Sequence, residues 1–143
     1  MNDTNKLYTH ISELIHSDTA TVCNINNMPN IQAIDKMQDL IHYVLQPVRL
    51  KFGAIHITSG YRCTILNQKV GGAVNSEHLY GQAADFVMYN QKINLHDVFV
   101  YIKDNLEYNQ LLFERNSKGD VWIHVSYLFG RNKKQAIDNY YVK

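Results

Sequence analysis

The sequence has little of the material that marks several common protein classes. Only two of its 143 residues are cysteine, and Cys23 and Cys63 lie far apart, which argues against a disulfide framework and a thiolate metal site. No apolar run is long enough for a membrane-spanning helix, and the first residues lack the pattern of a signal peptide. The formal net charge is +1 and no block of basic residues stands out, so the charge pattern does not favour a nucleic-acid or membrane partner.

The remaining composition is that of a soluble globular protein, with 45% apolar and 19% charged residues. A chain of 143 residues is long enough for one hydrophobic core. We therefore expect a single domain over residues 1–143, with its core between about residues 11 and 128 and a polar tail over 129–143. We expect the protein to be a monomer, with no nucleic-acid or membrane partner.

Apolar periodicity predicts two main helices. Apolar residues recur at helical spacing from Ile31 to Val48, with Asn30 as N-cap, Pro47 as a distortion and Gly53 as the end. The second helix spans 94–106. Short helices are expected over 12–16 and 64–69, an ordered loop over 19–29, and strands over 54–58, 82–89, 110–114 and 121–126. This order predicts an α+β fold, a small antiparallel sheet packed with helices.

Chemically reactive side chains gather in two stretches. Residues 59–87 contain Ser76-Glu77-His78, then Gly81 and Ala83-Ala84-Asp85, while residues 122–127 read Trp-Ile-His-Val-Ser-Tyr and contribute His124. Two imidazoles and one carboxylate suit a catalytic zinc, which takes three protein ligands and keeps one open position. His78 and Asp85 are too far apart in sequence to share a helix face, so a turn at Gly81 must bring them together.

These motifs resemble those of the zinc D-Ala-D-Ala carboxypeptidases and related peptidoglycan endopeptidases, which share the hedgehog fold and are often encoded by phages or prophages. The stretches SGYR, LN, VGG, S-x-H, G-x-A-A-D and W-x-H-V-S-Y occur in the family's order. The resemblance implies a hedgehog/DD-peptidase-like domain that binds one zinc ion through His78, Asp85 and His124. It also implies hydrolysis of peptidoglycan stem peptides. Without an export signal, the protein would reach the cell wall by phage-type release or virion delivery.

The general base is less clear from the motifs. One branch of the family carries a glutamate three residues before the last histidine ligand, where this chain has Val121. In the other branch a glutamate ends the preceding strand, which points to Glu114, with Asp120 in reserve. A three-residue loop over 117–119 would pair Glu114 with Trp122 and turn it toward His124. A two-residue turn would aim Glu114 away from the metal.

Two further residues match positions near the substrate. Arg62 of SGYR looks like the family's arginine that holds the substrate and the developing oxyanion, and Ser76 looks like a serine beside the substrate. A structural salt bridge for Arg62 and a loop hydrogen bond for Ser76 remain open. So does the choice between carboxypeptidase and endopeptidase action. The alternative class is a hedgehog-like domain with structural zinc that serves as a wall-binding or virion component.

Overall fold

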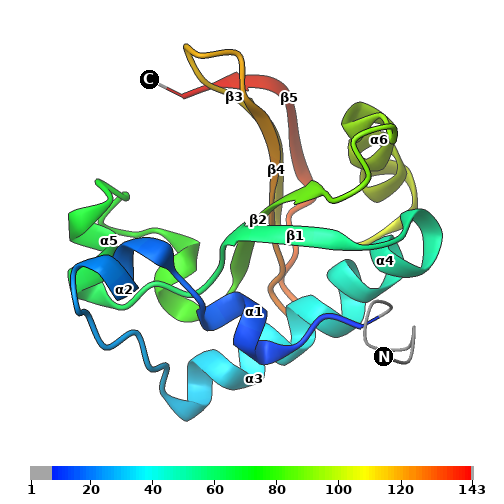
Figure 1. Ribbon diagram of the computed structural model, residues 1–143. Coiled ribbons are helices and arrows are strands. Elements are labelled where there is room, and N and C mark those ends of the chain that lie inside the picture. Colours follow the sequence, from blue (N-terminus) through cyan, green and yellow to red (C-terminus); the bar gives the residue numbers. More distant parts are fainter. Residues whose placement is uncertain (1–7, 143) are drawn as a thin grey trace, which may run out of the picture.

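The computed structural model describes residues 8–142, so residues 1–7 and 143 of the expected domain lie outside the described part. The helical elements are α1 (Ile11–Ile15), α2 (Asp18–Val22), α3 (Ile31–Leu40), the π-helix η2 (Ile41–Leu45), α4 (Gln46–Phe52), α5 (Thr64–Lys69), the 3₁₀-helix η3 (Glu77–Tyr80) and α6 (Leu95–Asn105). The strands are β1 (Ile55–Ser59), β2 (Ala83–Met88), β3 (Gln110–Arg115), β4 (Val121–Ser126) and β5 (Gln135–Tyr141). The predicted α+β class is confirmed (Figure 1). None of the helices between residues 8 and 142 has the length and hydropathy needed to cross a membrane.

The five strands form one sheet in the order β1-β2-β4-β3-β5. Neighbouring strands are antiparallel except β3 and β5, which are parallel. Side chains alternate between the two faces of each strand, so Phe86 and Ile123 lie on the face opposite to Asp85 and His124.

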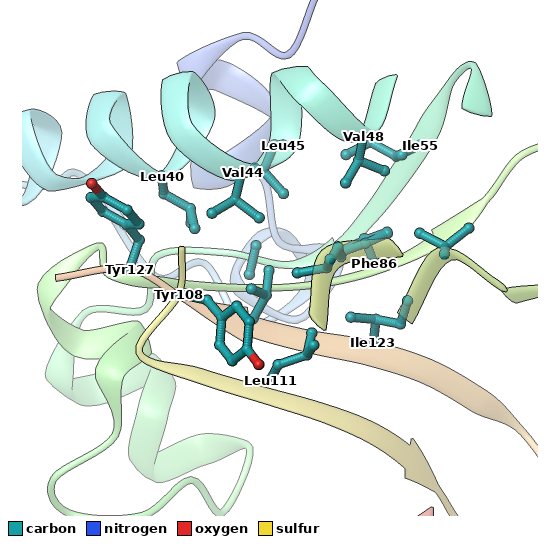
Figure 2. Packing of buried hydrophobic residues seen from close by; sticks show 14 of the residues in the cluster. Leu40, Val44, Leu45, Val48, Ile55, Phe86, Tyr108, Leu111, Ile123 and Tyr127 are labelled. Carbon is teal, nitrogen blue, oxygen red and sulfur yellow. The ribbon is translucent and has the colours of Figure 1, made fainter. Parts of the chain in front are cut away.

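The hydrophobic core lies between one face of this sheet and the long helical segment α3–η2–α4. Figure 2 shows Leu40, Val44 and Val48 pointing from that segment toward the sheet, on whose facing side Phe86 and Ile123 lie, and all five are fully buried. The packed face is therefore closed by apolar side chains. The polar side chains of Asp85 and His124 lie on the opposite face.

The long helical segment begins as predicted and then deviates. The side chain of Asn30 accepts a hydrogen bond from the backbone N–H of Ala33 at 2.8 Å, which confirms Asn30 as N-cap. A π-helical turn over 41–45 separates α3 from α4, and Pro47 lies in the first turn of α4. The helical segment is continuous here, with Gln46 N–H donating to Ile41 O, and the π-helical turn is the distortion that accompanies the proline. Gly53, at φ 97°, ends α4.

Two segments differ from the sequence prediction. The sequence predicts a loop over 19–29, but the first residues of this range belong to α2. This short helix is capped by the Ser17 hydroxyl, which accepts a hydrogen bond from Ala20 N–H. In the polar tail, β5 pairs in parallel with β3, and Ala136 packs against the core. Backbone hydrogen bonds hold this edge strand. Its mostly exposed side chains show no alternation that a pattern search could detect.

The β3–β4 hairpin has the register that the three-residue loop predicts. Glu114 pairs with Trp122, and Leu112 pairs with His124. Gly119 adopts the left-handed conformation at φ 86°, and its N–H donates to the carbonyl of Asn116 at 3.1 Å. Glu114 and His124 consequently share the face opposite to the hydrophobic core.

Candidate active site

Three side chains with metal-binding groups meet on the polar face of the sheet. Asp85 on β2 and His124 on β4 are direct cross-strand partners. His78 comes from η3, and the chain then turns at Gly81, which adopts the left-handed conformation at φ 74°. A side chain at Gly81 would also collide with the backbone carbonyl of Ala33. The glycine is therefore required both for the turn and for the close approach to α3.

The three groups are close enough to share one ion. One donor atom from each of His78, Asp85 and His124 lies within 4.8 Å of the others. His124 Nδ1 donates to Asp85 Oδ1 at 2.8 Å, and His78 Nε2 lies 3.4 Å from the same oxygen. In a tetrahedral zinc site with bonds of about 2.0–2.1 Å, neighbouring donor atoms are separated by about 3.3 Å. The observed separations fit such a site.

The surroundings of the donors also suit a metal. The Nδ1–H of His78 donates to the carbonyl of Gly60 at 2.7 Å, which fixes the ring and leaves Nε2 facing Asp85. An outer hydrogen bond of this kind is typical of histidines that bind metals. Both histidine residues are buried. Two nitrogen donors and one carboxylate form the ligand set of many catalytic zinc sites.

The charges within the cluster change the pKa values of its members. Burial by itself would raise the pKa of Asp85, but the two histidines outweigh this effect and hold the pKa well below its usual value. Burial lowers the pKa of His124, yet the hydrogen bond and the charge of Asp85 raise it overall. An ionised carboxylate can serve as a metal ligand, and an imidazole must lose its proton to do so. Binding of a metal ion at His124 would therefore release a proton.

Glu114 lies beside this cluster but is not one of its three metal-binding groups. Its Oε1 is 3.9 Å from His124 Nδ1, and the residue is only 9% exposed. Burial and the charge of Asp85 raise the pKa of Glu114 to about 7, against the weaker lowering effects of His124, Trp122 and Arg62. A carboxylate with a pKa near neutral can both accept and donate a proton at physiological pH.

Asp120, the reserve candidate for the base, lies in a different environment. It is exposed in the β3–β4 turn, where its carboxylate accepts a hydrogen bond from the side chain of Asn116 at 3.2 Å. Glu114, in contrast, lies next to the predicted ligands. The geometry therefore favours Glu114 as the base.

Arg62 and Ser76 are brought together next to the same cluster. Arg62 Nη2 donates to Ser76 Oγ at 3.1 Å, and the same oxygen accepts from the backbone N–H of His78 at 3.2 Å. Burial lowers the pKa of Arg62, and the charges of Asp85 and Glu114 act in the opposite direction. Arg62 forms no ion pair within residues 8–142, and its buried Nε has no acceptor there. Ser76 thus makes the loop hydrogen bond that the sequence left open.

Several supporting groups have no clear signal in the sequence. The carbonyl of Gly60 holds His78, and the hydroxyl of Thr58 donates to the backbone carbonyl of Asp85 at 3.2 Å. Buried Asn67 lies against Gly72, where any side chain would collide with Asn67 and crowd the guanidinium of Arg62. SGYR, LN and VGG contain most of these residues. Their spacing does not reveal which backbone atom contacts which ligand.

The fold and the site define an α+β domain with a buried His–Asp–His metal-ligand set and an adjacent carboxylate. The model of the family described as Peptidase M15 matches residues 8–126, a range that includes the whole cluster. The chain belongs to this family and is accordingly a peptidase; members of the family are zinc enzymes. No curated protein matches the chain.

Proposed function

We propose that this protein is a zinc metallopeptidase that hydrolyses peptide bonds in the stem peptides of peptidoglycan. The observation that carries the proposal is the position of Glu114. A protein that used the metal only for structure would need His78, Asp85 and His124, but it would not need a second buried carboxylate with a pKa of about 7 beside them. The peptidoglycan substrate is supported by the resemblance of the motifs.

In this proposal His78, Asp85 and His124 hold one zinc ion per chain. When bound, zinc supplies Lewis-acid polarisation of the scissile carbonyl and makes water more acidic. Glu114 accepts the proton of the attacking water and then gives it to the leaving amine. Its side chain lies 3.9 Å from His124 Nδ1, beside the metal ligands, which supports both transfers.

Arg62 would act on the substrate in the same reaction. Its guanidinium remains charged and is oriented by Ser76, so it can donate hydrogen bonds to a carboxylate or to the oxygen that becomes negative. Both carboxypeptidase and endopeptidase action use this chemistry. They differ in whether the site binds a terminal carboxylate or a continuing chain.

The test is a mass analysis of products from purified peptidoglycan, treated with zinc-loaded protein, with chelator-treated protein and with the Glu114→Gln variant. We expect a free amine and a free carboxylate at one type of bond, with zinc-loaded protein only. The product masses identify the bond. A protein that binds zinc and wall material but releases no product would refute the proposal and would favour the non-catalytic, hedgehog-like alternative.

A further inference from the structure

Asn27 lies in the loop between α2 and α3, and the residue is only 7% exposed. Its carboxamide contacts the backbone of two segments that are distant in the sequence. Nδ2 donates to the carbonyls of Ile15 at 2.8 Å and Tyr61 at 2.9 Å, while Oδ1 accepts from the N–H of Cys63 at 2.8 Å. Both N–H groups and the oxygen of the side chain are therefore used. The function proposed above gives this residue no role.

Two of the three contacts of Asn27 lie on either side of Arg62. Residues 60–63 belong to no helix or strand, so no regular backbone hydrogen-bond pattern holds this part of the chain. Asn27 binds the carbonyl of the peptide group before Arg62 and the N–H of the peptide group after it. The N–H of Arg62 itself donates to the carbonyl of His78 at 3.0 Å. Because both peptide groups that flank Arg62 are bound, the direction in which its side chain leaves the backbone is fixed.

The guanidinium of Arg62 depends on this backbone support because its own side-chain contacts are few. Nη2 donates to Ser76 Oγ at 3.1 Å, and the buried Nε has no acceptor among residues 8–142. Arg49 shows the contrast, since its guanidinium donates to Thr9 Oγ1 and to Glu13 Oε1, both at 2.7 Å. Arg49 is thus fixed through its side chain. Arg62 is fixed through its backbone, which leaves donor capacity for a substrate.

We propose that Asn27 is a positioning residue of the active site: its carboxamide fixes the peptide groups on both sides of Arg62 and thereby directs the guanidinium toward the substrate. The inference rests on the function proposed above, which gives Arg62 its role on the substrate. A misplacement of about 1 Å at a catalytic group can lower turnover by about 100-fold. Loss of the Asn27 carboxamide would leave the guanidinium present but no longer held in one place. The alternative is a purely structural asparagine that joins its loop to α1 through Ile15.

The first test measures the turnover of purified peptidoglycan by the Asn27→Ala and Asn30→Ala variants at equal zinc content. Asn30 is the matched control because it lies in the same loop and binds the N–H of Ala33 rather than the segment of Arg62. Both changes remove hydrogen bonds of an asparagine side chain, so both should lower the melting temperature by a few degrees. Only Asn27→Ala should also lower turnover, by about tenfold. If the alanine variant does not fold, Asn27→Ser, which keeps one hydroxyl group at this position, takes its place.

A double-mutant cycle then shows whether Asn27 acts through Arg62. The Arg62→Ala background has no guanidinium to position, so adding Asn27→Ala there should lower the residual turnover by no more than about twofold. A purely structural role would not produce a loss of turnover that disappears together with Arg62. The proposal is overturned if Asn27→Ala lowers turnover by the same factor in both backgrounds. It is also overturned if the Asn27→Ala and Asn30→Ala variants have equal turnover.

Amide hydrogen exchange separates this inference from the proposed function. The N–H of Arg62 is bonded to His78 and not to Asn27, so its exchange rate reports whether the segment stays in place. Relative to the amide of Ile123 in the core, exchange at Arg62 should become about tenfold faster in Asn27→Ala and remain unchanged in Asn30→Ala. Equal protection of the Arg62 amide in both variants would overturn the proposal. If exchange is faster but the parent protein cleaves no peptidoglycan, the hold of Asn27 on this segment is supported and only the proposed function is refuted.

Discussion

Replacing Glu114 with glutamine should make the metal-free protein more stable at pH 8. Burial and the neighbouring Asp85 raise the pKa of Glu114 to about 7, from an ordinary value of 4.5. The folded state then binds more protons than the unfolded state, so stability declines as pH rises from about 4.5 through 7. Above pH 7 this pKa difference corresponds to a loss in the free energy of unfolding of at most about 3 kcal/mol. Partial access of water reduces it, and we expect a gain of roughly 1–3 kcal/mol for Glu114→Gln.

The assay is urea unfolding in the presence of chelator at pH 4.5 and pH 8. The gain should be present at pH 8 and should largely vanish at pH 4.5, where the carboxyl group is mostly protonated in the folded state. Glu107→Gln is the matched control because that carboxylate is exposed and lies 3.5 Å from Lys134. A gain of the same size at both pH values, or none at pH 8, would refute the electrostatic account of this site.

The same variant separates the base from the ligands. With zinc added, Glu114→Gln should retain the metal, because Glu114 is not proposed as a ligand, and it should release no product from peptidoglycan. Zinc content and product masses are measured on one preparation. Near-normal turnover would move the role of the base to Asp120.

Three other predictions follow from the site. His124→Ala should bind no zinc and lose the stabilisation that zinc gives the parent, as measured by metal content and by melting with and without zinc. Arg62→Ala should lower turnover about 100-fold, equivalent to ~3 kcal/mol, and Arg62→Lys should restore part of it at an unchanged melting temperature; if melting temperature falls in step with turnover, Arg62 is structural. Gly81→Ala should destabilise the fold by more than 1 kcal/mol and weaken zinc binding, because the added carbon meets the carbonyl of Ala33. Gly119→Ala, with a similar φ of 86° and open space, should show the smaller cost of the backbone alone; equal costs would contradict the steric argument.

The parts of the structure that the sequence predicts well depend on neighbours in the chain. The helix α3 is capped by Asn30, which lies three positions from its hydrogen-bond partner Ala33, and the apolar stripe of the helix repeats with the helical period. The register of the β3–β4 hairpin depends on one turn, where Gly119 supplies the left-handed conformation. These interactions span only a few residues, so their pattern can be detected in one sequence. The candidate ligands depend on a different signal, the motifs that resemble a known family.

Other features depend on contacts between distant segments. The parallel pairing of β5 with β3, for example, involves backbone groups about 25 positions apart in the sequence. The side chains of β5 carry little information about this pairing, because the strand lies at an edge and is mostly exposed.

The candidate site also combines features that the sequence predicts with features that depend on contacts between distant segments. Its residue types and their order can be identified along the chain, including His78, Asp85 and His124. Only the tertiary structure places the carbonyl of Gly60 against His78 and buries Glu114 beside the ligands. Burial and proximity raise the pKa of Glu114 to about 7, and both are properties of the packed molecule. The sequence by itself therefore determined which groups are available for catalysis, while the fold decided their distances and their state of protonation.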